Sequence, residues 1–314
     1  MVRNGLSGRK GSARFHPACC KALQVNCPPV HLPGHASCNR VCVRLVSLLL
    51  FSATALSALG GNDEIDFRFR EGLIWVAVQV REAETPLNFL LDTGAGVSVI
   101  NLGTARKLGL PTGHPVKVRG VGATTTGYWP QHLTPTLPGV LPNNCLAVDL
   151  SALSGACECQ VDGLIGADFF RDQIVQIDFE ARKVRRVSAS DPLDAAKCIP
   201  LKIRHGALLA PVRVDDGAQK WVRVDTGCAS SLQWVTSGGL PTDQPGVPAV
   251  ALSSLSIATT FTQVRLGSDT FPEVPTGLHQ KEIFPGEAGL LGNGLLSRYR
   301  SVIIDWKSRR LFLK

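Results

Sequence analysis

Two copies of the tripeptide Asp-Thr-Gly are the part of this sequence best suited to chemistry. Asp92 begins the first copy and Asp225 begins the second, and each copy follows an apolar run and precedes small residues. Two carboxyl groups held about 3 Å apart cannot both ionise, so the pair shares one proton and one pKa rises. The ionised member can accept a proton from water while the protonated member polarises a carbonyl group. Asp92 and Asp225 are therefore candidate catalytic residues for a hydrolysis reaction.

The two tripeptides belong to a longer internal repeat. In each half, an apolar run ends in Asp-Thr-Gly, two apolar residues later precede a glycine, and a final alternating run turns back as in a β-hairpin. One Asp-Thr-Gly can arise by chance, but two copies within the same series of segments indicate a duplication. The paired segments keep their order and nearly their spacing: 88–100 with 220–232, 162–170 with 288–296, and 173–187 with 300–314.

The composition favours short strands joined by tight turns. The 314 residues include 31 glycines and 20 prolines, and only 18% are charged. We predict an all-β fold with two similar lobes related by a pseudo-two-fold axis. The N-terminal lobe is expected over residues 61–194 and the C-terminal lobe over 195–314, because Ala-Ser-Asp-Pro at 189–192 favours the start of a linker. Residues 1–60 are expected to be a leader.

The repeat resembles the aspartic peptidases. The resemblance rests on both Asp-Thr-Gly copies and on the segments Leu164-Ile165-Gly166 and Leu290-Leu291-Gly292, and it covers essentially everything after the leader. Because each lobe is short, the chain is similar to two retropepsin-like halves fused in one polypeptide. The resemblance implies lobes of the closed β-barrel type and an aspartic endopeptidase without a metal or cofactor. It also implies that Thr93 and Thr226 hydrogen-bond across the axis and that Gly94 and Gly227 form the turns.

Two positions depart from the pepsin-like members of that family. Such members often have a Ser or Thr three residues after the catalytic Asp, where it donates to the outer carboxyl oxygen. This sequence has Ala95 and Cys228 instead. Loss of a donor to a carboxylate raises its pKa. We therefore expect a less acidic pH optimum than that of a pepsin-like enzyme.

A hairpin that could cover the site is predicted at residues 117–130. This segment is rich in Gly and Thr, as is typical of a mobile hairpin. The resemblance implies a flap over the substrate, with Tyr128 or Trp129 in contact with it. An ordinary surface hairpin with a half-buried aromatic residue is the alternative. The matching region of the second lobe, near 247–263, contains no glycine, so the two flaps are expected to be unequal.

The N-terminal sequence is typical of an exported protein, either periplasmic or secreted. Residues 45–59 are apolar and follow Arg40 and Arg44, so a signal-peptide-like segment is expected at about 41–60. An uncleaved membrane anchor is the alternative, although a spanning helix needs about 20 apolar residues. Residues 1–61 hold seven basic residues and no acidic one, whereas the net charge of the whole chain is +8. The body is therefore nearly neutral, and no nucleic-acid partner is expected.

The ten cysteines are divided between the leader and the body. In the body, a local disulfide is expected between Cys145 and either Cys157 or Cys159, because export permits disulfides. In the leader, four residues have spacings that could suit zinc, but chance composition is favoured because no strand or helix pattern surrounds them. These four residues are Cys27, His31, His35 and Cys38.

The expected partner is a peptide or protein substrate that binds as an extended strand. One chain supplies both aspartates, so a monomer is expected. Two alternatives stay open: a catalytically silent peptide-binding protein of the same fold, and a homodimer in which each lobe pairs with another chain. Sequence signatures of other hydrolases, such as H-E-x-x-H and G-x-S-x-G, do not occur. Asp178 and Asp305 also repeat, but within the hairpin segments, where we expect them to be structural.

Overall fold

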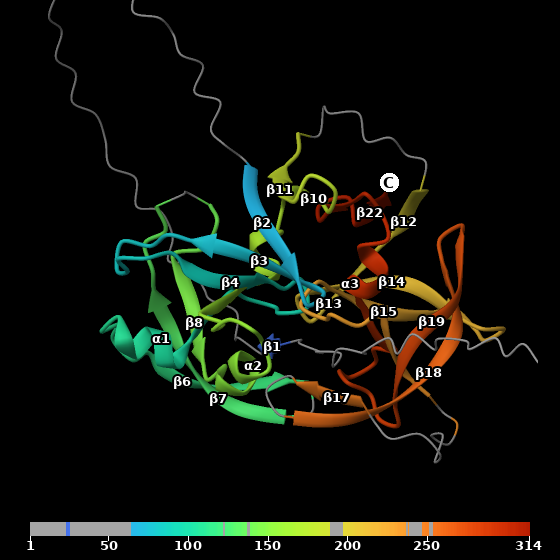
Figure 1. The fold of residues 1–314 in the computed structure, drawn as a ribbon, viewed down its shortest axis with the longest axis horizontal. Coiled ribbons are helices and arrows are strands. Elements are labelled where there is room, and N and C mark those ends of the chain that lie inside the picture. The colour runs from blue at the N-terminus through green and yellow to red at the C-terminus, as the bar shows by residue number, and fades with distance from the viewer. Residues whose placement is uncertain are drawn as a thin grey trace, which may run out of the picture.

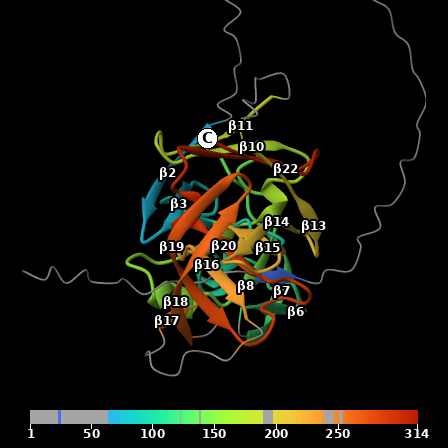
Figure 2. The same ribbon diagram turned by 90° about the vertical axis from the view of Figure 1, so that its right-hand side faces the viewer.

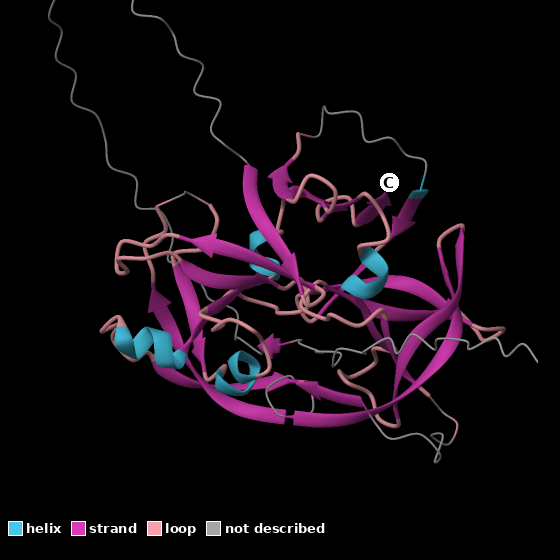
Figure 3. Cartoon of the chain, in the orientation of Figure 1, coloured by secondary structure: helices cyan, strands magenta, loops and turns pink. Residues whose placement is uncertain are grey.

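The computed structural model describes residues 23–25, 64–121, 123–136, 139–188, 197–236, 238, 247–250 and 254–314. Within these residues the chain is mostly β-strand with a few short helices, so the predicted all-β class is confirmed (Figure 3). No helix in this part of the chain is long and apolar enough to cross a membrane. The signal-like segment, the four leader residues with zinc-like spacing and the start of the predicted linker lie outside the described residues.

The first lobe, residues 64–188, is a series of neighbouring strands in the order β6-β7-β8-β5-β9-β4-β3-β2. The strands form where apolar side chains recur between tight turns, as in the run Leu73–Val78. The strand bounds are β2 Glu64–Arg70, β3 Leu73–Val78, β4 Leu87–Leu91, β5 Val99–Asn101, β6 His114–Gly120, β7 Ala123–His132, β8 Asn144–Val148 and β9 Gly163–Ile165. The helices are α1 Leu102–Lys107, α2 Ser151–Gly155 and the 3-10 turn η1 Ala167–Phe169. A further strand, β1 (Leu23–Val25), pairs with the edge of β6.

In the second lobe, residues 197–314, the strand pairings form a closed ring. β14 pairs with β15 on one side and with β18 on the other, so the order β14-β15-β20-β16-β19-β18 returns to β14. Figure 2 shows β18, β19, β16 and β20 of this lobe facing the viewer. The bounds are β13 Lys202–Arg204, β14 Ala207–Val214, β15 Lys220–Asp225, β16 Leu232–Val235, β17 Val247–Val250, β18 Ser254–Leu266, β19 Asp269–His279, β20 Gly289–Gly292 and helix α3 Asn293–Leu296.

Strands from both lobes join in one further layer, in the order β2-β11-β10-β21-β22-β12 (Figure 1, top). β10 pairs antiparallel with β21, with Ile174 opposite Asp305 and Asp178 opposite Ser301. This register is centred on Gln176 and Ile303, which are equivalent positions of the sequence repeat. The two lobes are therefore related by a pseudo-two-fold axis through this pair, as predicted. The bounds are β10 Ile174–Asp178, β11 Lys183–Arg186, β12 Cys198–Pro200, β21 Ser301–Asp305 and β22 Arg310–Leu313.

The repeated hairpin acids have structural contacts. The carboxylate of Asp178 accepts a hydrogen bond from the backbone N–H of Ala181 at 2.8 Å. The carboxylate of Asp305 accepts one from the backbone N–H of Ser308 at 2.9 Å. Each acid thus closes the turn of its own hairpin, β10–β11 or β21–β22, in line with the sequence-based expectation.

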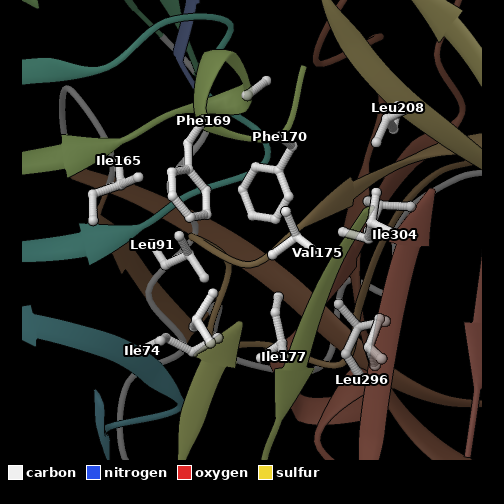
Figure 4. Close-up of a cluster of buried hydrophobic side chains, with 14 of the residues drawn as sticks. Ile74, Leu91, Ile165, Phe169, Phe170, Val175, Ile177, Leu208, Leu296 and Ile304 are labelled. Carbon is white, nitrogen blue, oxygen red and sulfur yellow. The ribbon is translucent and has the colours of Figure 1, made fainter. Parts of the chain in front are cut away.

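One hydrophobic cluster runs from lobe to lobe (Figure 4). Leu91 comes from the first lobe, Val175 from β10, and Ile304 from β21 of the second lobe. Phe169 and Phe170 add an edge-to-face aromatic pair, with 5.2 Å between ring centroids. Because each such side chain stabilises the fold by roughly 1.5–3 kcal/mol when buried, a shared core resists separation of the lobes.

The expected local disulfide does not form, and no disulfide joins the cysteines in the described part of the chain. Side chains alternate along β8, so Cys145 faces the large cluster while its neighbour Leu146 faces a second cluster. Cys157 and Cys159 pack against that second cluster. The prediction was wrong because Cys145 points to one face of β8, whereas Cys157 and Cys159, in the loop after α2, pack against the cluster on the other face.

Candidate active site

The two Asp-Thr-Gly turns meet between the lobes. Asp92 directly follows β4, and Asp225 ends β15. Each strand pairs in parallel with the strand of the later apolar-apolar-glycine segment: β4 with β9, and β15 with β20. Both aspartate side chains are completely buried, and the two carboxyl groups interact with each other. The structure thus brings together the two residues that the sequence indicated as a pair.

The glycine of each tripeptide lies against the aspartate of the other lobe. A Cβ atom added to Gly94 would lie 2.5 Å from Cγ of Asp225, and one added to Gly227 would lie 2.4 Å from Cγ of Asp92. Carbon atoms do not approach this closely, so any side chain here would displace the opposite carboxyl group. The two glycines therefore make the short distance across the axis possible.

The two threonines hydrogen-bond across the axis. The N–H of Thr93 donates to Oγ1 of Thr226 and the N–H of Thr226 donates to Oγ1 of Thr93, both at 3.0 Å. Each hydroxyl donates in turn to a carbonyl of the opposite strand: Thr93 to Val224 at 2.7 Å, and Thr226 to Leu91 at 2.8 Å. The arrangement is the same from either lobe, and it fixes one turn against the other.

The turns also rest on close backbone contacts with the apolar-apolar-glycine segments. A Cβ atom at Gly166 would come within 2.3 Å of the carbonyl carbon of Val97. One at Gly292 would come within 2.2 Å of the carbonyl oxygen of Ser230. Glycine at both places lets β9 and β20 pack directly against the turns and support them.

Different side chains support the two turns from behind. In the first lobe, Asp168 accepts hydrogen bonds from the N–H and the hydroxyl of Ser98, at 2.8 and 2.7 Å. In the second lobe, the side-chain amide of Asn293 donates to the carbonyl of Thr226 at 2.6 Å and to that of Gly72 at 2.9 Å. Sequence reasoning did not single out these supports, although Asp168 and Asn293 both lie within the repeated segment that follows the turn.

Each aspartate has one oxygen fixed by backbone donors. Oδ1 of Asp92 accepts from the N–H groups of Gly94 and Ala95, at 2.9 and 3.0 Å, and Oδ1 of Asp225 accepts from that of Gly227 at 2.9 Å. Oδ2 of both aspartates is buried without an N–H or hydroxyl donor. A proton shared by the carboxyl groups can lie between them there.

Burial makes both carboxyl groups harder to ionise. It raises the pKa of Asp92 to about 6, although the backbone donors oppose the rise. Burial, with the nearby charge of Asp92, raises the pKa of Asp225 well above its ordinary value. The pair therefore keeps a proton at pH values where exposed aspartates have lost theirs.

Sequence reasoning missed a buried ion pair beside the second turn. The side chains of Arg223, on β15, and Glu287 are 0% and 1% exposed, and the guanidinium donates from Nε and Nη2 to the carboxylate at 2.8 and 2.6 Å. Its Nη1 donates to the carbonyl of Gly94 in the first lobe at 2.8 Å. The available signal was charge at two positions where the first copy of the repeat has Leu90 and Val161.

Comparison with known proteins agrees with this geometry. Residues 76–169 match a family model described as aspartyl protease, and the match includes Asp92 and the first apolar-apolar-glycine segment. These residues are thus similar to part of an aspartyl protease. The resemblance inferred from the repeat is thereby confirmed for the first lobe.

Two further comparisons add no identification. No curated protein matches the chain. Among solved structures, basic 7S globulin from soybean is similar, with 11% sequence identity, a TM-score of 0.44, and coverage of 80% of this chain and 95% of that chain.

The hairpin predicted at residues 117–130 is formed by β6 and β7 and is called the flap below. Its tip reaches the second lobe. Val121 at the tip is 1% exposed and packs with Cys228, Ile257 and Phe284. Ile257 lies on β18, which forms a matching hairpin with β17, so hairpins from both lobes meet here (Figure 1). The tip thus contacts the second lobe at Cys228, three residues after Asp225.

Tyr128 and Trp129 lie at the base of the flap and not at its tip. Trp129 pairs with His114 and Tyr128 with Pro115, at the end of the hairpin farthest from the turn. Tyr128 packs against the large cluster and Trp129 against the second cluster. Contact of these two residues with a substrate stays a prediction.

A cavity of about 630 Å³ lies between the flap tip and the loop that follows β19. Residues 119–124 of the flap, except 122, line one side, and His279 at the end of β19 lines the other with loop residues 280–283 and 285. Nε2 of His279 lies 2.6 Å from Oε1 of Gln233, and burial lowers the pKa of this histidine to about 4. The volume is within the range of about 300–1,000 Å³ that is usual for ligand sites. In the part of the chain that the structure describes, no group of three or more His, Cys, Asp or Glu is arranged for a metal ion.

Proposed function

We propose that this protein is an aspartic endopeptidase in which Asp92 and Asp225 act as one catalytic pair. The approach of the two buried carboxyl groups, each against the glycine of the opposite lobe, is the observation that carries the proposal. A binding protein has no evident need for two close carboxyl groups that are costly to bury. The aspartyl protease match over residues 76–169 supports the same conclusion.

The chemistry follows from the shared proton. The ionised carboxyl group accepts a proton from a water molecule as the water oxygen attacks the scissile carbonyl carbon. The protonated carboxyl group donates a hydrogen bond to the carbonyl oxygen and then its proton, which gives a tetrahedral diol. Transfer of one proton to the amide nitrogen and loss of another from a hydroxyl group break the C–N bond. The products are an acid and an amine, and the pair again holds one proton.

The proposed substrate is an extended peptide or protein segment that lies between the turns and the flap. Val121 is buried against the second lobe, so the flap has to open before such a segment can enter. One chain supplies both aspartates, so we propose that the monomer is active. We also propose that the protein is exported, on the basis of the signal-like segment at about 41–60.

Cleavage of an unstructured protein by the full chain tests this proposal. Asp92→Asn and Asp225→Asn are each expected to lower kcat/KM by roughly a thousandfold or more, because either change removes the shared acid and base. Asp66→Asn is the matched control, since the side chain of Asp66 is 89% exposed. A wild-type protein that is folded but inert across pH 3 to 7 would contradict the proposal and favour the silent peptide-binding alternative.

A further inference from the structure

The second lobe buries two charges where the first lobe buries two apolar side chains. Leu90 and Val161 pack in the same hydrophobic cluster. Their counterparts in the repeat are Arg223 and Glu287, which are both buried. An apolar pair avoids the desolvation that a buried ion pair has to overcome, and it often gives equal or better stability. The charges therefore call for an explanation other than stability.

The guanidinium of Arg223 is held on every side. Glu287 accepts two hydrogen bonds from it, and the centroid of the Phe284 ring lies 3.7 Å from Cζ. The remaining terminal nitrogen points across the axis to the carbonyl of Gly94 at 2.8 Å. A rigid positive charge from the second lobe thus rests on the catalytic turn of the first lobe.

One peptide group connects this charge to the first aspartate. The carbonyl of Gly94 and the N–H of Ala95 belong to the same peptide group, and that N–H donates to Oδ1 of Asp92 at 3.0 Å. A hydrogen bond to a carbonyl polarises the peptide and strengthens its N–H as a donor. Arg223 therefore favours the ionised form of Asp92 through its field and through this peptide.

The second aspartate lacks the equivalent arrangement. Oδ1 of Asp225 accepts from Gly227, while the N–H of Cys228 donates to the backbone carbonyl of Asp225 at 3.1 Å. The position that corresponds to Arg223 is Leu90, which brings no charge to this side. Burial, the carboxyl group of Asp92 and the thiol of Cys228 act against ionisation of Asp225, whereas the charge of Arg223 favours it, as it does for Asp92. The hydrogen bond from Arg223 to the carbonyl of Gly94 acts on Asp92 through the peptide group, and this contact distinguishes the two aspartates. Among the residues that the structure describes, Arg223, its partner Glu287 and Cys228 are the charged or titratable groups beside the pair.

We propose that Arg223 is a positioning residue that assigns the shared proton. Acting through the Gly94–Ala95 peptide, it keeps Asp92 ionised and Asp225 protonated. Asp92 is then the base toward water, and Asp225 donates to the carbonyl oxygen of the substrate. This inference rests on the proposed function for its catalytic meaning, but the location of the proton can be measured without catalysis.

The test is a titration of the full chain with ¹³C-labelled aspartate carboxyl groups. Asp92→Asn and Asp225→Asn assign the two signals. In the wild type, we expect Asp92 to ionise at the lower pH. Arg223→Leu with Glu287→Val copies the apolar pair of the first lobe and leaves no unpaired buried charge. In this double variant the midpoint of Asp92 should rise by about one pH unit and approach that of Asp225.

A second variant gives a shift of the opposite sign. Glu287→Gln removes only the negative charge, so the midpoint of Asp92 should fall. If Arg223 had a purely structural role, the midpoint of Asp92 would not rise in the double variant and fall in Glu287→Gln. The inference is overturned if Asp225 ionises first in the wild type, or if Glu287→Gln leaves the midpoint unchanged or raises it. The Glu287→Gln result decides the matter even if the double variant does not fold.

A parallel peptidase assay separates this inference from the proposed function. The acidic limb of the kcat/KM profile should move with the midpoint of Asp92, upward in the double variant and downward in Glu287→Gln. If the wild type cleaves nothing, the proposed function fails, while the titration still shows whether Arg223 locates the proton. If cleavage occurs but neither limb nor midpoint moves, the role of Arg223 fails alone.

Discussion

The two lobes make the same contacts across the pseudo-two-fold axis but bury different side chains behind those contacts. Thr93 and Thr226 make the same hydrogen bonds across the axis. One layer farther back, the first lobe has Leu90 where the second has Arg223. Contacts on the axis have to fit both lobes at once, so the repeat keeps them alike. Residues away from the axis are free to differ, and two carboxyl groups that hold a single proton need unlike surroundings.

The largest effects should come from changing the glycine contacts that are the same in both lobes. Gly94→Ala and Gly227→Ala each place a Cβ atom within about 2.5 Å of the opposite Cγ, so each should lower kcat/KM by at least about a hundredfold. Gly155→Ala is the control, because a Cβ there meets no atom within 4 Å. Loss of activity in only one of the two variants would mean that the turns are not equivalent.

The buried ion pair that distinguishes the second lobe can be tested by its effect on the free energy of unfolding. Arg223→Leu alone leaves Glu287 buried without its partner, so the free energy of unfolding should fall by roughly 3–5 kcal/mol. Adding Glu287→Val should recover most of that loss, because the pair then matches Leu90 and Val161. Urea denaturation of the two variants and the wild type measures both changes. Equal stabilities of the single and double variants would show that the unpaired charge of Glu287 does not cause the loss of stability.

The threonine contacts should give equal and smaller effects. Thr93→Val and Thr226→Val each remove a hydroxyl that donates to and accepts from the opposite lobe, which should lower the free energy of unfolding by roughly 1–3 kcal/mol. The double variant should cost less than the sum, since each change has already broken contacts of the other. Additive losses would indicate that the two residues act independently.

A pH dependence of stability is expected as well. The pKa values of Asp92 and Asp225 are raised in the folded state, so the folded protein binds these protons more tightly than the unfolded chain does. The contribution of Asp92 is fully present below about pH 4 and is lost as pH rises through about 6, at no more than about 1.4 kcal/mol per pH unit. The contribution of Asp225 changes with pH in the same direction. Asp225→Asn should flatten this decline. A wild-type-minus-variant difference that rises between pH 4 and 6 would contradict the shifts.

Raised pKa values also bear on the pH optimum. Ala95 and Cys228 supply no hydroxyl to the carboxyl oxygens, and Oδ2 of both aspartates has no donor. The expectation of a less acidic optimum than that of a pepsin-like enzyme therefore stands as a prediction. A kcat/KM profile for the full chain measures it.

The two Asp-Thr-Gly turns and the two hairpins could be predicted because their sequence signals are local and occur twice. Asp-Thr-Gly marks a strand end followed by a turn, and the alternating runs at 173–187 and 300–314 mark hairpins, so short stretches of sequence contain the signal. Duplication then indicated that the two aspartates come together. The all-β class and the pseudo-two-fold relation follow from these same segments, and the structure confirms both.

The remaining features depend on registers that the sequence does not display. Arg223 meets Glu287 only because β15 and β20 run in parallel at a particular offset. The location of Tyr128 at the base of the flap depends on where the hairpin turns, and Gly and Thr throughout that segment left the turn undefined. Cys145 was assigned to a disulfide because spacing along the chain does not show which face of a strand a side chain takes.

The register between β10 and β21 has a consequence for how these molecules meet one another. Because the pairing is centred on equivalent residues, Gln176 and Ile303, each strand presents to its partner nearly the pattern that it receives. Because β10 comes from the first lobe and β21 from the second, two molecules that refold at high concentration can exchange halves, with β10 of one paired to β21 of the other in the same register. Such an interlocked dimer would contain two complete sites, and dilution before refolding is the way to avoid it.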